Sequence, residues 1–297
     1  MDFANKLLHF IKILYKYKLL KRGYARLIRA IVHIFANSEW LQVTLPNHAV
    51  FWINLKDPSC IPLFMKGEVP GGWTFFETCA PKWKAMIDVG ANVGMISVAV
   101  AARNPECNIV AFEPSPLPFE VLRRNCQLYP NIKPEWCAVG DRSGYTRLFL
   151  SKSSVFNSTT RSSVKANNKS VIDVPQVSLD EYARQIGGGP DIVKVDVEGG
   201  EYEVLRGAKT LIRSPHPPVW FVEVNTVFLA ERRLHYSMIR EAFQNDCTEF
   251  LSFLWDHKDK SLRRIDVPPS FRGNVVYIPR VRLHEYAEFI KGANGLW

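Results

Sequence analysis

The chain has 297 residues, of which 47% are hydrophobic and 12% aromatic, so a wholly disordered protein is excluded. The formal charge of +9 is uneven: residues 1–36 hold eight basic residues against one acidic residue, and the remainder holds 30 against 28. This nearly neutral body argues against nucleic acid as a partner, because such binding needs a basic surface on the folded domain.

Residues 1–38 mix basic and apolar residues in a pattern that predicts an amphipathic helical arm. Its apolar runs are far shorter than the ~20 residues that span a bilayer. The arm therefore fits an anionic membrane surface, contacted through residues 1–36, or docking on its own domain or on a second subunit of a homo-oligomer. Six scattered cysteines without a Cys-x-x-Cys pair indicate a reducing compartment. We therefore expect a cytoplasmic protein, peripheral on the inner face of the membrane if the arm binds lipid.

Two further regions follow the arm. Short strand-like stretches separated by a turn signal predict a hairpin in a small β-rich cap over residues 39–84. Over residues 85–297 strand and helix patterns alternate, which is typical of an α/β domain whose mostly parallel sheet has helices on both faces. The expected strands of this domain are 85–89, 108–112, 137–139, 192–197 and 219–224, with antiparallel pairs formed by 145–150 with 171–177 and by 250–255 with 274–278.

One segment of this domain has a different composition. Residues 151–170 are rich in Ser, Thr and Asn, carry four basic residues and contain no acidic residue. The segment is either a disordered surface loop or a lid that faces the substrate, because long loops in compact domains are often functional.

A glycine loop follows the first strand of this domain. Asp88 precedes Gly90, and Gly94 opens the next helix, so the spacing is Gly-x-x-x-Gly. The dinucleotide fingerprint, which places a pyrophosphate on the helix N-terminus, has the spacing Gly-x-Gly-x-x-Gly instead. This difference disfavours a nucleotide-dependent oxidoreductase, and Asp88 would suit a cationic amino group better than a phosphate.

Acidic residues follow the neighbouring strands. Glu113 stands 19 residues beyond Gly94, where an acid accepts hydrogen bonds from ribose hydroxyls. Asp196 lies at the carboxyl end of a buried strand, Glu198 lies two residues further on, and Glu223 with Asn225 ends the next strand. Parallel strands end at one edge of the sheet, so these side chains are expected around one crevice.

Several of these segments together resemble the FkbM family of S-adenosylmethionine-dependent methyltransferases. The resemblance rests on residues 88–94, 112–116 with Phe119, Glu120 and Asn125, 177–180, and 194–201 with 204–208, and it covers about residues 85–225. It implies a Rossmann-like sheet of seven strands and O-methylation, often of sugar or polyketide hydroxyls. Carried over by position, Asp88, Gly90, Asn92 and Gly94 would line the methionine end of the cofactor, Glu113 would hold the ribose, and Gly140 and Asp141 would lie near the adenine.

The expected activity is thus an O-methyltransferase acting on a hydroxyl of a sugar, a glycan or glycolipid, or a related natural product. A sugar hydroxyl is a weak acid, so it needs a base or a metal ion. Asp196 is the first candidate for the base and Glu198 the second, although Glu198 would also suit the start of the following helix. Asp196, Glu223 and Asn225 would offer oxygen ligands to Mg²⁺. A non-catalytic, membrane-recruited module that keeps the cofactor fold is the alternative from another class of function.

Overall fold

A computed structural model describes residues 40–292, except positions 56, 58–59, 61–62, 65–66, 151–157, 160–169, 245 and 269. The predicted arm over residues 1–38, and most of the segment 151–170, lie outside the described residues. Within the described part of the chain, no helix is both long enough and apolar enough to cross a membrane.

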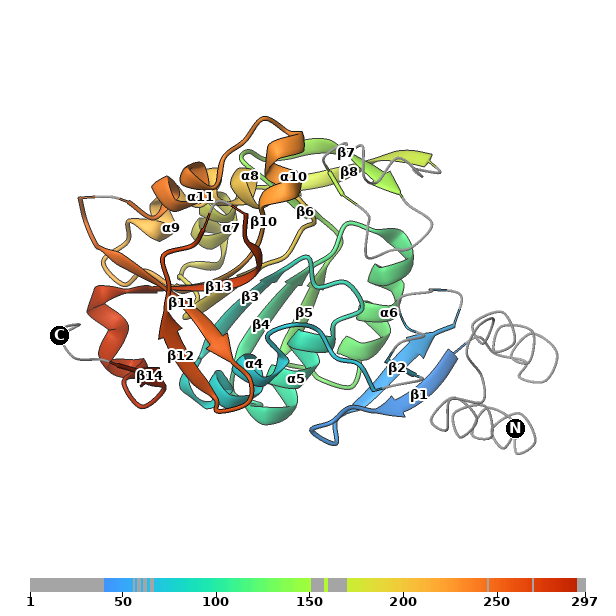
Figure 1. The fold of residues 1–297 in the computed structure, drawn as a ribbon. Helices are drawn as coiled ribbons and strands as arrows, with labels where there is room; N and C mark the ends of the chain where they lie inside the picture. Colours follow the sequence, from blue (N-terminus) through green and yellow to red (C-terminus); the bar gives the residue numbers. More distant parts are fainter. Residues whose placement is uncertain are drawn as a thin grey trace.

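A large sheet forms the centre of the molecule (Figure 1). Among the described residues it has nine strands, in the spatial order β14 (Ile290–Lys291), β12 (Ser261–Arg264), β11 (Phe250–Asp256), β13 (Arg272–Pro279), β10 (Val219–Asn225), β9 (Ile192–Val195), β3 (Ala85–Val89), β4 (Asn108–Phe112) and β5 (Ile132–Glu135). Strands β10, β9, β3, β4 and β5 are parallel, whereas β13 is antiparallel to β10 and to β11. The predicted fold class is confirmed. The family resemblance implies seven strands, and the described residues add β12 and the edge strand β14 beyond β11.

Helices cover both faces of this sheet (Figure 1). One face carries α4 (Trp73–Cys79), the 3₁₀ helix η1 (Ala80–Lys82), α5 (Met95–Arg103) and α6 (Pro116–Cys126). The other carries α7 (Leu179–Ile186), α8 (Glu201–Arg206), α9 (Lys209–Ile212), α10 (Thr226–Glu231) and α11 (Tyr236–Ala242), and a 3₁₀ helix η3 (Arg280–Tyr286) follows β13. Successive strand residues alternate between the two hydrophobic cores: Met86 belongs to the first and Ile87 to the second.

Two smaller sheets flank the central one. The expected hairpin of the cap is β1 (Trp40–Thr44) with β2 (Val50–Asn54), and it is joined to α6 because Asn125 Oδ1 accepts from the Trp52 backbone N at 2.6 Å. A three-stranded sheet holds β6 (Ala138–Val139), β8 (Ser170–Val177) and β7 (Gly144–Leu150), and the predicted antiparallel pairing of the last two is confirmed.

The third strand of the parallel series was predicted wrongly. We expected residues 137–139 in the central sheet, but Ala138–Val139 pairs with β8 and the central-sheet strand is Ile132–Glu135. That strand has the sequence Ile-Lys-Pro-Glu, which has no apolar pattern. Because β5 is the edge strand, it tolerates the proline and the charges that conceal it.

Candidate active site

A cavity of about 290 Å³ opens where β3, β4 and β9 end. The loops after these strands and the strand β6 supply most of its wall, and Leu63, Glu68, Pro70, Ser158 and Thr159 complete it. Of the eleven residues predicted for the site, five line the cavity: Gly90, Asn92, Glu113, Asp196 and Glu198. The other six lie outside its lining: Asp88, Gly94, Gly140, Asp141, Glu223 and Asn225.

The loop between β3 and α5 approaches the end of β9 very closely. Gly90 has a φ of +75°, and a Cβ atom at this position would lie 1.9 Å from the carbonyl oxygen of Asp196. The backbone N–H groups of Gly90 and Ala91 both donate to the carbonyl oxygen of Phe112, at 3.0 and 2.9 Å. Position 90 therefore requires glycine for its backbone conformation and for space, and the loop is held to two neighbouring strands at once.

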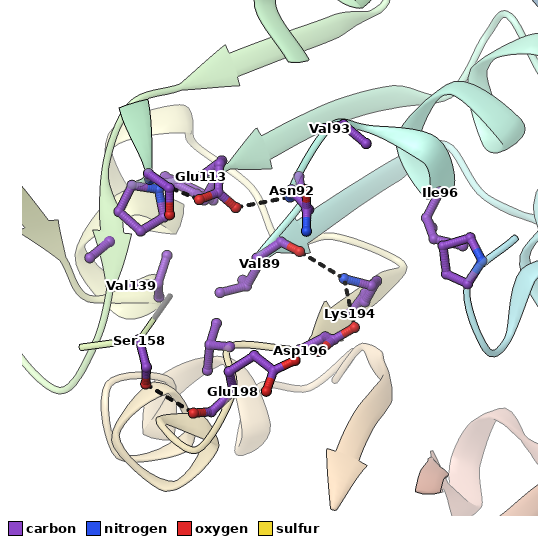
Figure 2. Close-up of a pocket in the computed structure, with 18 of the residues that line it drawn as sticks. Val89, Asn92, Val93, Ile96, Glu113, Val139, Ser158, Lys194, Asp196 and Glu198 are labelled. Carbon is purple, nitrogen blue, oxygen red and sulfur yellow. Dashed lines mark hydrogen bonds and ion pairs between the residues drawn. The ribbon is translucent and has the colours of Figure 1, made fainter. Parts of the chain in front are cut away.

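Glu113 is fixed at the end of β4 by backbone donors. Its side chain is buried, with Oε2 accepting from the Asn92 N–H at 2.9 Å and Oε1 from the Ser115 N–H at 2.8 Å. Burial raises the pKa of Glu113, and the hydrogen bonds from Ser115 and Asn92 offset part of that rise. The carboxyl is thus held in one orientation on one side of the cavity, opposite Asp196 and Glu198 (Figure 2).

A buried lysine of β9 pairs with an aspartate of the neighbouring strand β3. Lys194 belongs to β9, its side chain is 4% exposed, and its Nζ lies 3.0 Å from Asp88 Oδ1 and 3.7 Å from Asp196 Oδ2. Burial alone would lower the pKa of Lys194, but the negative charges of Asp88 and Asp196 outweigh it, so the pKa lies above its usual value and the ammonium stays charged. Asp88 is itself fully buried, accepts from Ser97 Oγ at 2.7 Å, and lies outside the cavity lining.

Three carboxyl groups meet beside Lys194. Ligand atoms of Asp196, Glu198 and Glu223 all lie within 4.8 Å of one another. Burial, and then the negative charges of Asp196 and Glu198, raise the pKa of Glu223 to about 9. Burial and the neighbouring charges therefore favour the neutral form of Glu223, whereas the Asp196 side chain, 36% exposed, faces the cavity.

The loop after β9 has its own internal support. Glu198 has a φ of +58°, an uncommon conformation for a residue with a side chain. The buried Glu201 stabilises this turn, because its Oε1 accepts from the N–H of Val197 at 3.2 Å and of Gly199 at 3.0 Å. Burial raises the pKa of Glu201 to about 7, and Arg232, the residue after α10, donates to the Gly199 carbonyl oxygen.

Three predicted residues have other contacts. Asp141 forms an ion pair with Arg206 at 3.6 Å. Asn225 caps helix α10, where its Oδ1 accepts from the Phe228 N–H at 3.5 Å. Gly94, with a φ of +90°, begins α5, and a Cβ there would lie 2.7 Å from a methyl carbon of Leu122.

Lys194 was not predicted as a site residue from the sequence. Neither were the lining residues that come from outside the strand ends, Leu63, Glu68, Pro70, Ser158 and Thr159. A lysine within the otherwise apolar strand Ile-Val-Lys-Val is a usable signal, because a buried charge is rarely found without a partner. Ser158 and Thr159 belong to the segment predicted as a loop or a lid, and Ser158 Oγ donates to the Glu198 carbonyl oxygen at 2.9 Å. Because these contacts join distant parts of the sequence, no local sequence pattern predicts them.

The cavity fits a cationic nucleoside cofactor. The carboxyl groups of Glu113 and Asp196 lie on opposite sides of the cavity, so its two ends are acidic. Apolar side chains next to Glu113, among them Phe112 and Val139, suit a flat base. A sulfonium cofactor needs this acidic, partly apolar setting and no phosphate-binding loop.

The mostly parallel sheet, its glycine loop and the acid-lined cavity at the strand ends define a Rossmann-like domain of the class I methyltransferase type. Residues 88–261, more than half of the chain, match the family described as the methyltransferase FkbM domain. The chain therefore belongs to this family of S-adenosylmethionine-dependent methyltransferases.

Individual relatives are more distant. Methyltransferase 1 of Beauveria bassiana is 28% identical over 142 residues, covering 41% of this chain and 57% of the relative. Methyltransferase sdnD of Sordaria araneosa is 29% identical over 153 residues, with 41% and 59% covered. The hexuronic acid methyltransferase AglP of Haloferax volcanii is 30% identical over 132 residues, with 43% and 51% covered. The chain spans about half the length of these curated relatives.

Solved structures are similar at low identity. The O-methyltransferase from Bacillus cereus, in complex with SAH, has a TM-score of 0.40 at 10% identity and covers 71% of this chain and 82% of its own. Fibrillarin of Aeropyrum pernix, with bound S-adenosyl-L-methionine, has a TM-score of 0.38 at 13% identity and covers 80% and 93%.

Proposed function

We propose that this protein methylates a hydroxyl group of a sugar, a glycan or glycolipid, or a related natural product, with S-adenosylmethionine as the methyl donor. Two relatives support the acceptor class. AglP carries the name of a hexuronic acid methyltransferase, and a relative in Streptomyces tacrolimicus, 38% identical over 64 residues, is a 31-O-demethyl-FK506 methyltransferase.

The residues on the β3 and β4 side would hold the cofactor. Glu113 would accept from the ribose hydroxyls, while Gly90 and Asn92 would lie against the methionine part. Asp141, predicted near the adenine, lies outside the cavity lining, so its part in binding would be indirect. When bound, S-adenosylmethionine supplies a methyl group on a cationic sulfur.

The residues on the β9 side would handle the acceptor proton. Asp196 lines the cavity and its neighbour Glu223 does not, so Asp196 is the carboxyl placed to accept the proton that leaves the hydroxyl. Glu198 lines the same wall and would orient the acceptor or serve as a second base. The observation that carries this assignment is the placement of Asp196 at the cavity between Lys194 and the Glu223 carboxyl.

Calorimetry with the purified protein is the direct test of the cofactor. We expect binding of S-adenosylmethionine and none of NAD(H), because the cavity has no phosphate-binding fingerprint. Binding of the dinucleotide alone would overturn the proposal and favour the oxidoreductase. Cofactor turnover with a library of glycans, glycolipids and polyketides then identifies the acceptor, and a protein that binds cofactor but methylates none of them would favour the non-catalytic module.

A Mg²⁺ ion is a separate proposal at the same wall. The converging oxygens belong to Asp196, Glu198 and Glu223 rather than to the predicted set, since Asn225 is engaged in capping α10. A divalent ion there would take oxygen ligands and help to ionise the hydroxyl. The expected result is activity that EDTA removes and Mg²⁺ restores, and activity unchanged by EDTA would reject the ion.

Membrane recruitment through residues 1–36 is likewise a proposal. It is supported by the excess of basic residues in this segment, because anionic lipid attracts such sequences. Flotation with anionic liposomes, compared between the full chain and a chain lacking residues 1–36, tests it. Equal flotation of the two would reject recruitment through the arm and leave docking on the protein or on a second subunit, which size-exclusion measurements distinguish.

A further inference from the structure

The ammonium group of Lys194 joins three parts of the site. Its Nζ lies 3.0 Å from Asp88 Oδ1, donates to the Gly90 carbonyl oxygen at 3.1 Å, and lies 3.7 Å from Asp196 Oδ2. Asp88 and Lys194 are direct neighbours in the register of β3 and β9, which brings the two charges together. One side chain thus contacts the cofactor-side loop and the carboxyl assigned as the base, as Figure 2 shows, and also the buried counter-ion Asp88.

The partners of Lys194 are anchored as well. Asp88 accepts from Ser97 Oγ in α5 at 2.7 Å, so the lysine is held from a helix as well as from two strands. An ammonium has three N–H groups, and three oxygen atoms surround this one. The Asp196 carboxyl is therefore constrained on its Oδ2 side by a charge that cannot move freely.

Stability alone does not explain this arrangement. A buried ion pair costs desolvation, and replacing one with well-packed apolar residues is often neutral or stabilising. The other residues of β9 are Ile192, Val193 and Val195, all fully buried, so an apolar residue at position 194 would suit the strand. A charged side chain at this one position, below the cavity, indicates a role in the site.

We propose that Lys194 is a positioning residue that holds the Asp196 carboxyl in register with the Gly90 loop, so that base and cofactor keep a fixed relative orientation. This inference rests on the proposed function of Asp196. Lys194 does not act as the base, because it is already charged. Its part is to orient a carboxyl whose misplacement by about 1 Å would cost on the order of 100-fold in rate.

The test compares a neutral pair with the native ion pair. Lys194→Met alone leaves Asp88 buried without its counter-ion and is expected to destabilise the fold, so the informative variant is Asp88→Asn with Lys194→Met. Lys133→Met is the matched control, since Lys133 is 64% exposed and pairs with Glu135 away from the cavity lining. We expect the double variant to fold, to bind S-adenosylhomocysteine within about threefold of the wild type, and to lose about 100-fold in kcat with little change in acceptor KM.

A folded double variant with full kcat would overturn the proposal, and so would one in which only cofactor affinity and KM change. Hydrogen exchange gives a second measurement that needs no acceptor. Faster exchange is expected in residues 195–201 of the double variant and no change in the hairpin of residues 40–54, and unchanged exchange in 195–201 would overturn the role of Lys194. A wild type that binds cofactor but methylates no acceptor would instead contradict the proposed function, while the exchange measurement still decides the role of Lys194.

Discussion

The carboxyl groups on the two sides of the cavity have different surroundings. On the β4 side, both oxygens of Glu113 accept hydrogen bonds from backbone N–H groups, so the carboxyl is held in one orientation. On the β9 side, Asp196, Glu198 and Glu223 lie close together, and their mutual repulsion with burial raises the pKa of Glu223. The first arrangement suits a fixed hydrogen-bond acceptor, and the second suits a site of proton transfer.

The largest expected effect comes from removing the proposed base. Asp196→Asn keeps the shape of the side chain but cannot take a proton, so kcat should fall by about 1,000-fold. Calorimetry should show cofactor affinity within about threefold of the wild type, because Glu113 and the Gly90 loop are unchanged. A folded Asp196→Asn protein with full kcat would contradict the assignment and the proposed difference between the two sides.

The second prediction concerns the support of the β9 loop. The pKa of Glu201 is about 7 in the folded protein against 4.5 for the free group, so between these values the folded state binds more protons than the unfolded state. The free energy of unfolding should therefore fall as pH rises from 4.5 to 7, by up to roughly 3 kcal/mol from this group.

Glu201→Gln should remove that loss, because the amide oxygen still accepts from Val197 and Gly199 and carries no charge. Urea unfolding at pH 5 and at pH 8 measures the effect, with the exposed Glu106→Gln as the control. The same pH dependence in Glu201→Gln and the wild type would show that Glu201 is not the group that titrates.

The third prediction tests the β4 side. Glu113→Gln replaces a charged acceptor with a neutral one, and hydrogen bonds to charged groups contribute about 1.5–3 kcal/mol. Cofactor affinity should therefore fall by about 10- to 100-fold, while kcat at saturating cofactor changes little. A fall in kcat with unchanged affinity would mean that the β4 side also takes part in the chemistry.

The smallest effect is expected at Glu198. Glu198→Gln should change kcat by about threefold and mainly raise the acceptor KM, if Asp196 is the base and Glu198 only orients the acceptor. Steady-state kinetics beside Asp196→Asn separates the two residues. A loss of kcat in Glu198→Gln as large as that in Asp196→Asn would contradict the assignment and indicate that Glu198 is the base.

Much of the fold followed from local patterns. Apolar strands alternating with helices predicted the α/β sheet, and the pairing of β7 with β8 and of β11 with β13 was anticipated. The edge strand Ile132–Glu135 was missed because an edge position relaxes the demand for apolar residues.

The sequence by itself determined which acids stand at the ends of strands, because parallel strands end at one edge wherever the helices between them lie. Only the tertiary structure decided what each acid contacts. Asp88 lies beneath the cavity with Lys194, Asn225 caps a helix, and Glu198 joins Asp196 and Glu223. The physical reason is that a side chain's role depends on its burial and its nearest charges, and these come from segments about 100 residues apart, such as Asp88 and Lys194.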